Sequence, residues 1–196
     1  SYGADLYGDP RLPELLRALA SIDGIEWIRV HYTHPKTWSE ALIAVFEEER
    51  KICRYVDIPL QHVTDPMLRR MRREVCRADM ERLIERLRDR IPGVAICTHF
   101  IVGFPGETAE DFEELLGYVR RAALDHVGCF AYSREDGTPA GLMKGQIPER
   151  VKLARRRSLM AEQRAVAETV GGRWVGRTVD VLVDAPVPGR PGVWVG

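Results

Sequence analysis

Apolar residues return every three or four positions along much of the chain, which is the spacing of one buried helix face. The segment 10–22 shows this period after Asp9, an expected N-cap, and Pro10. A capping-box pattern marks a second start at Thr37, and an acidic first turn follows Thr108. Further helices are predicted over about 37–50, 64–73, 77–91 and 148–170, and from 108 onward.

Between these helices the pattern changes to short runs that are rich in β-branched and aromatic residues. Strands are predicted at 25–32, 55–60, 94–102 and 126–133. The run 94–102 is almost continuously apolar, as expected of a strand covered on both faces. Strands that alternate with helices through long connections favour an α/β fold with a parallel sheet, either doubly wound or part of a barrel.

After Gly172 the helical period stops, and valines alternate with prolines and glycines. We therefore predict two parts, an α/β part over 1–171 and the truncated beginning of a small β-domain over 172–196.

Composition narrows the class of protein. The 196 residues carry 29 Lys and Arg against 29 Asp and Glu, and 45% are hydrophobic, as in ordinary globular proteins. There is neither an apolar run long enough for a membrane span nor a signal peptide at the start, so we expect a cytoplasmic protein without a membrane partner. Basic residues gather over 150–177, either as a solvated helix face or as a patch for an RNA-rich partner such as the ribosome.

The four cysteines lie far apart, at Cys53, Cys76, Cys97 and Cys129. Their spacing matches neither a zinc site nor an iron–sulfur cluster loop, so no metal ligands are expected in this chain. His31 and His34 offer two metal-binding side chains, but without a nearby third ligand, surface or hydrogen-bonded histidines are the simpler interpretation.

All four predicted strands end in polar, aromatic or glycine residues. Because the carboxyl ends of parallel strands meet at one edge, these residues predict a ligand-binding rim. Each segment also has a structural interpretation: Gln61 and His62 could cap a loop, and 103–106 could be an ordinary turn. The acid–base groups do not define a mechanism by sequence alone.

The segments YVDIPLQH, THFIVGFPGET and VGCFAYSREDGTPA, with RVHYTHP and SYGADLYG, resemble the methylthiotransferases of the radical S-adenosylmethionine superfamily. The resemblance covers about 1–170, and the tail resembles the start of a TRAM β-domain. It implies the later part of a partial TIM-like (β/α) barrel. DIPLQH and VGCFAYS resemble the RimO-type branch, which modifies an aspartate β-carbon of a small-subunit ribosomal protein.

The family's cofactors would be S-adenosylmethionine and two [4Fe–4S] clusters. By position, the resemblance implies a cofactor side made of Pro59, Gln61, Phe100, Val102, Gly103, Phe104, Pro105, Gly106, Glu107, Phe130 and Tyr132. It implies a substrate side with His31, Tyr32 and His62. It gives no catalytic residue.

One departure from the family is large, because the chain has no C-x-x-x-C-x-x-C loop to bind a cluster. We therefore expect a fragment that is inactive alone. Two alternatives remain open: a MiaB-like tRNA methylthiotransferase, and a non-catalytic α/β binding module.

Overall fold

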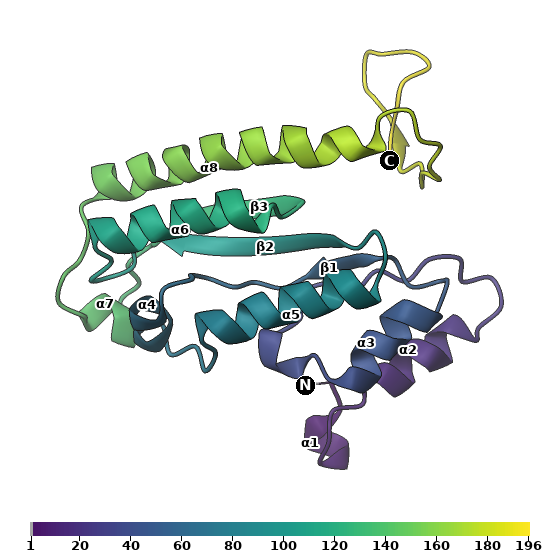
Figure 1. Ribbon diagram of the computed structural model, residues 1–196, viewed down its shortest axis with the longest axis horizontal. Coiled ribbons are helices and arrows are strands. Elements are labelled where there is room, and N and C mark those ends of the chain that lie inside the picture. Colours follow the sequence, from purple (N-terminus) through teal and green to yellow (C-terminus); the bar gives the residue numbers. More distant parts are fainter. Residues whose placement is uncertain (1) are drawn as a thin grey trace.

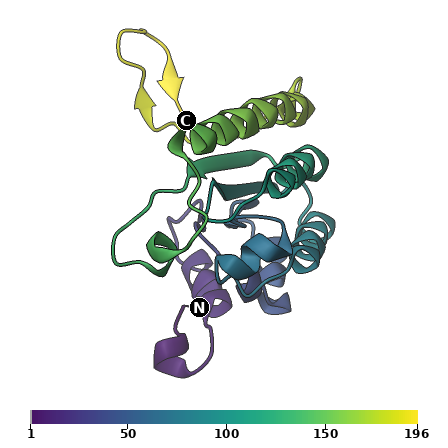
Figure 2. The same cartoon turned by 90° about the vertical axis from the view of Figure 1, so that its left-hand side faces the viewer.

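A computed structural model describes residues 2–196 and shows three parallel strands in the order β1-β2-β3. The strands are β1 (Tyr55–Asp57), β2 (Ala95–Val102) and β3 (His126–Ala131). Helices α5 (Arg77–Arg90) and α6 (Ala109–Ala122) connect them and lie on one side of the sheet (Figures 1 and 2). The predicted parallel α/β arrangement is confirmed.

The remaining helices flank this unit. The long helix α8 (Glu149–Gly171) runs beside β3 and α6 (Figure 1). The shorter elements are α1 (Ala4–Tyr7), α2 (Leu12–Ala20), the 3-10 turn η1 (Pro35–Thr37), α3 (Glu40–Glu48), α4 (Asp65–Arg70), α7 (Pro139–Leu142) and the 3-10 turn η2 (Gly172–Trp174). None of the helices in residues 2–196 is both long and apolar enough to cross a membrane.

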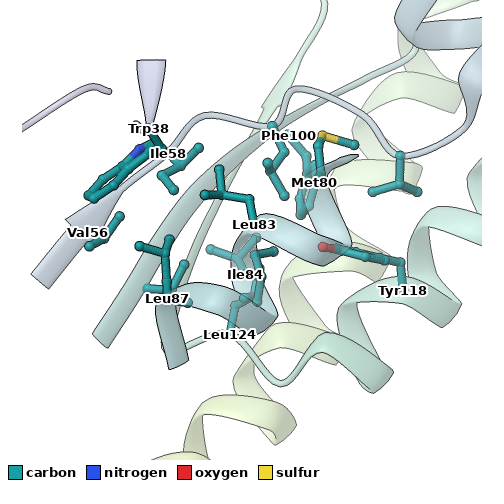
Figure 3. Close-up of a cluster of buried hydrophobic side chains, with 14 of the residues drawn as sticks. Trp38, Val56, Ile58, Met80, Leu83, Ile84, Leu87, Phe100, Tyr118 and Leu124 are labelled. Atoms are coloured by element: carbon teal, nitrogen blue, oxygen red, sulfur yellow. The ribbon is translucent and has the colours of Figure 1, made fainter. Parts of the chain in front are cut away.

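The core lies between α5, α6 and the helix-covered face of the sheet. Leu83, Ile84 and Leu87 point from α5 toward Val56 of β1 and Phe100 of β2 (Figure 3). All are buried, and each such apolar side chain stabilises the fold by roughly 2 kcal/mol through its removal from water. This core fixes the sheet, and with it the ends of the three strands.

The expected strand 25–32 is not a regular strand. Within it Ile28 forms an isolated bridge with Ile52, which precedes β1, and just after it the Thr33 N–H donates to the Asp57 carbonyl of β1. β-rich composition forms a strand only where a neighbour supplies a continuous ladder, and residues 25–32 meet their neighbour at these separate points.

Several helix starts also differ from the predictions. Helix α2 begins at Leu12 after Arg11, so Asp9 is not its N-cap. Helix α3 begins at Glu40, because the Ser39 hydroxyl, not Thr37, accepts a hydrogen bond from the Leu42 N–H.

Other predicted elements are confirmed. Helix α6 follows a Thr108–Asp111 capping box, and α5 and α8 occupy their expected ranges. The strand at 94–102 is present, but one of its faces is only partly covered, because Ala95, His99 and Ile101 remain partly exposed while Cys97 on the same face is buried. The tail forms a small exposed hairpin of β4 (Ala185–Pro186) and β5 (Trp194–Val195).

Candidate functional site

The carboxyl end of β2 leads into a tight turn over residues 103–107. Gly103 and Gly106 both have positive φ, of 73° and 84°, which an L side chain rarely adopts. The turn is closed by Glu107, whose Oε2 accepts a hydrogen bond from the Gly103 N–H at 2.5 Å. Glu107 is buried, so its carboxylate organises the backbone of the turn from inside the protein.

The other oxygen of Glu107 binds His62. Thr64 N–H donates to His62 Nδ1 at 3.1 Å, which leaves the ring proton of the neutral imidazole on Nε2. That nitrogen lies 3.2 Å from Glu107 Oε1 and donates to it. His62 is completely buried, so the structure places this predicted substrate-side residue beneath the rim and away from its surface.

Helix α8 contacts the same turn with two adjacent cationic side chains. Arg155 Nη1 lies 2.5 Å from Glu107 Oε2, and the Lys152 ammonium donates to the Tyr132 carbonyl at 2.7 Å. The Lys152 stem occupies the space over Gly103, where an added Cβ would lie only 2.1 Å from Lys152 Cγ. Helix α8 therefore holds the ends of both β2 and β3.

The backbone of Gln61, at the rim, is strained. Its φ of 71° is left-handed, and its N–H donates to the His99 carbonyl while its own carbonyl accepts from Ile101 N–H. Backbone strain of this kind is costly and tends to occur at functional sites. Two buried side-chain oxygens at this rim, Gln61 Oε1 and the Tyr132 hydroxyl, have no hydrogen-bond partner among the described residues 2–196. Unpartnered buried polar atoms are rare in folded proteins, and they fit a polar ligand bound at this edge.

The face of the sheet opposite α5 and α6 is called here the open face. It carries Tyr55, Asp57, Cys97, His99 and Phe130, which alternate with core residues along the three strands. Phe130 is more than half exposed, and its ring centroid lies 5.7 Å from that of His99.

Asp57 is the buried acid of this face. Its two oxygens lie 3.6 Å from His31 Nδ1 and 3.8 Å from His99 Nδ1. Beside it, burial raises the pKa of Cys97, and burial together with the Cys97 hydrogen bond raises the pKa of Tyr55. Both of these groups are therefore uncharged at neutral pH.

The residues of the sequence-based site divide into four groups, the last of which is the exposed pair His31 and Tyr32. Gln61, Gly103, Gly106, Phe130 and Tyr132 lie at the strand ends or on the open face. Phe100 and Val102 direct buried side chains to the helix-covered face, where the Phe100 ring meets Tyr118 edge-on. The third group consists of buried residues in or beside the turn over residues 103–107: Pro59, His62, Phe104, Pro105 and Glu107. His31 and Tyr32 are exposed.

Sequence reasoning missed His99, Lys152 and Arg155. His99 is a polar residue in the almost continuously apolar run 94–102, and this polar position is a signal for a strand face that is not fully covered. Lys152 and Arg155 lie three residues apart, a spacing that places them on one face of the helix and that the prediction of a basic patch does not use.

The cysteines of this chain do not form an iron–sulfur cluster site. The four cysteines are free, and Cys97 and Cys129 are buried. Burial raises the pKa of Cys129 to about 12. Across residues 2–196, no three His, Cys, Asp or Glu side chains come together in a way that could hold a metal ion. The side chains of residues 2–196 therefore do not fit as the ligands of an iron–sulfur cluster.

Comparison with known proteins gives consistent results. A ribosomal protein uS12 methylthiotransferase of Heliobacterium modesticaldum is 46% identical over 195 residues, covering all of this chain and 42% of that protein. One of Symbiobacterium thermophilum is 47% identical, covering all of this chain and 40% of that protein. The chain thus spans about two fifths of the length of these curated relatives.

Among solved structures, coproporphyrinogen III oxidase of Escherichia coli, described as a radical SAM enzyme, is similar with a TM-score of 0.58 and 19% identity. The match covers 82% of this chain and 36% of that one, and it confirms the predicted partial barrel fold. The family model of the radical SAM superfamily matches residues 2–119, which is more than half of the chain. From its fold and its sequence, the chain belongs to the radical SAM superfamily.

Proposed function

We propose that this chain is the later part of the catalytic barrel of a methylthiotransferase that acts on an aspartate β-carbon of ribosomal protein uS12. The observation that supports this most strongly is the identity of 46% with a relative of that name across the whole chain. We propose the division predicted from sequence as well, with a barrel part over 1–171 and the start of a TRAM-like domain over 172–196.

S-adenosylmethionine would bind at the rim. Gly103 and Gly106 allow the tight turn at the end of β2, and Gln61 and Tyr132 each offer a polar side-chain atom that has no hydrogen-bond partner within residues 2–196. Exposed Phe130 offers an aromatic face for the adenine, as a flat heterocycle requires. When bound beside a reduced cluster, S-adenosylmethionine supplies the hydrogen-abstracting chemistry of the family.

The buried residues would keep this rim in shape. Glu107, held by His62 and Arg155, fixes the Gly103 amide, and Lys152 fixes the Tyr132 carbonyl. Preorganisation of this kind orients a cofactor without touching it.

We propose that two [4Fe–4S] clusters take their ligands from outside these 196 residues, because the cysteines described above are separated and largely buried. The 196-residue chain alone is then inactive. The basic groups of α8 that point to solvent, among them Arg157 and Arg164, suit a ribosomal partner.

The test uses the whole translated product of the gene, reconstituted with iron and sulfide without oxygen. It is incubated with S-adenosylmethionine and a chemical reductant, with ribosomal protein uS12 in one reaction and with tRNA in another. Mass spectrometry that finds a methylthio group in place of hydrogen on a uS12 aspartate supports the proposal. Modification of tRNA, or of neither, contradicts it. The 196-residue chain is the matched control, with no product expected.

A further inference from the structure

We propose that Asp57, His31 and His99 form a subsite on the open face that binds a carboxylate of the substrate segment. The proposal rests on the proposed function, because the group it would recognise is the side chain of the aspartate to be modified. It assigns binding roles to two histidines, one of which, His99, the sequence reasoning had not considered.

The first observation is an unsatisfied buried carboxylate. Asp57 is only 6% exposed, and its Oδ1 has no hydrogen-bond partner within residues 2–196. The His99 Nδ1 that faces it at 3.8 Å is also buried and has no partner in the same range. A buried charge is destabilising unless it is closely paired, and these two atoms lie just beyond hydrogen-bond distance. A ligand that brings the His99 imidazole and the Asp57 carboxylate within hydrogen-bond distance of each other should therefore be favoured.

The second observation is the direction of the two rings. Both imidazoles turn Nδ1 toward Asp57, which leaves each Nε2 on the side of the ring away from that carboxylate. The His99 ring lies against Gly128, where an added Cβ would be 2.5 Å from ring Cδ2. A glycine on β3 thus makes room for His99 over the open face.

The third observation is the set of groups around Asp57, in which one guanidinium and two imidazoles surround one carboxylate. Asp57 is the single acid facing two imidazoles, and the guanidinium of Arg29 lies 4.0 Å above the Tyr55 ring nearby. Tyr55 and Cys97 are uncharged, because burial raises the pKa of each. A fully protonated imidazole can donate from Nδ1 to one carboxylate and from Nε2 to a second, and a bound anion favours that form.

A direct test titrates the 196-residue chain with blocked aspartate (N-acetyl-aspartate N-methylamide) and with the equivalent blocked asparagine. Histidine side-chain NMR signals report binding. The expected result is a saturable shift at His31 and His99 with the aspartate compound, a much weaker one with asparagine, and none at His126. Equal shifts with both compounds, or no shift at either histidine, overturn the proposal. A stronger response to S-adenosylmethionine itself also overturns it, because the carboxylate would then come from the cofactor.

A second test uses the whole translated product and ribosomal protein uS12. His99→Gln should raise KM for uS12 roughly tenfold or more through loss of one charge-assisted hydrogen bond, with little change in kcat. His126→Gln is the matched control, since His126 of β3 is an exposed histidine that lies on the open face, as His99 of β2 does. An unchanged KM in a His99→Gln protein that is correctly folded by circular dichroism overturns the subsite. If the wild type modifies no uS12, the proposed function fails, and the NMR titration alone decides the subsite.

Discussion

Replacing Arg155 by methionine should destabilise the protein far more than the loss of a surface charge. The side chain of Arg155 is 13% exposed, while that of Glu107 is fully buried. After Arg155→Met, the Glu107 carboxylate keeps the His62 and Gly103 donors but loses the guanidinium that pairs with it. Leaving one charge of a buried pair unpaired costs about 3–5 kcal/mol, and because two neutral donors remain we expect about 3 kcal/mol. Methionine retains most of the apolar stem.

Urea unfolding of the 196-residue chain measures this loss as a lower midpoint at constant slope. The matched control is Arg120→Met, because Arg120 forms an exposed ion pair with Glu162. That change should cost less than about 1 kcal/mol.

A double-mutant cycle makes the argument specific to the pair. Glu107→Gln removes the buried charge, so adding Arg155→Met to it should cost about 2 kcal/mol less than Arg155→Met costs in the wild type. If Arg155→Met costs no more than Arg120→Met, or if the coupling energy lies below about 0.5 kcal/mol, the described role of the pair is wrong.

Three further predictions concern the core, a helix cap and pH. Leu87→Ala should cost about 2–5 kcal/mol in urea unfolding, because Leu87 is fully buried between α5 and the sheet, and a loss below about 1 kcal/mol would contradict that packing. Thr108→Ala should lower stability by about 1 kcal/mol through loss of the cap hydrogen bond to the Asp111 N–H, with unchanged thermal unfolding as the contrary result. Burial, followed by the charges of Arg73 and Lys36, lowers the pKa of His34 from 6.5, so protonation favours the unfolded chain and stability should fall as pH drops below about 6.5. His34→Gln should remove that part of the pH dependence, and parallel stability–pH curves for the two proteins would refute it.

The sequence predicted the parallel sheet and its crossover helices because their signals are local. Periodicity located α5, and the Thr108 cap located the start of α6. The prediction of a strand over 25–32 is wrong, because strand formation depends on a neighbouring strand. Composition does not show whether a continuous ladder of hydrogen bonds to such a neighbour exists.

The sequence predicts the edge of the sheet at which the candidate site lies, but not which of its residues are buried. Strand ends correctly pointed to one edge, where Gln61, Gly103 and Tyr132 meet. Sequence position could not show that His62 lies beneath that edge, since its burial is set by Glu107 and by a helix that begins more than 80 residues later. The partner Arg155 comes from α8, and such long-range pairing leaves no local pattern.

The tail has a practical consequence for anyone who purifies this chain. Val179, Val181, Leu182 and Val183 are all more than half exposed, and they form a short β-prone run with one acid among them. Such runs can stack edge to edge between molecules and seed insoluble aggregates. Concentrated solutions should therefore precipitate through this tail, and ending the expressed chain after Gly172 should leave the barrel part soluble at higher concentration.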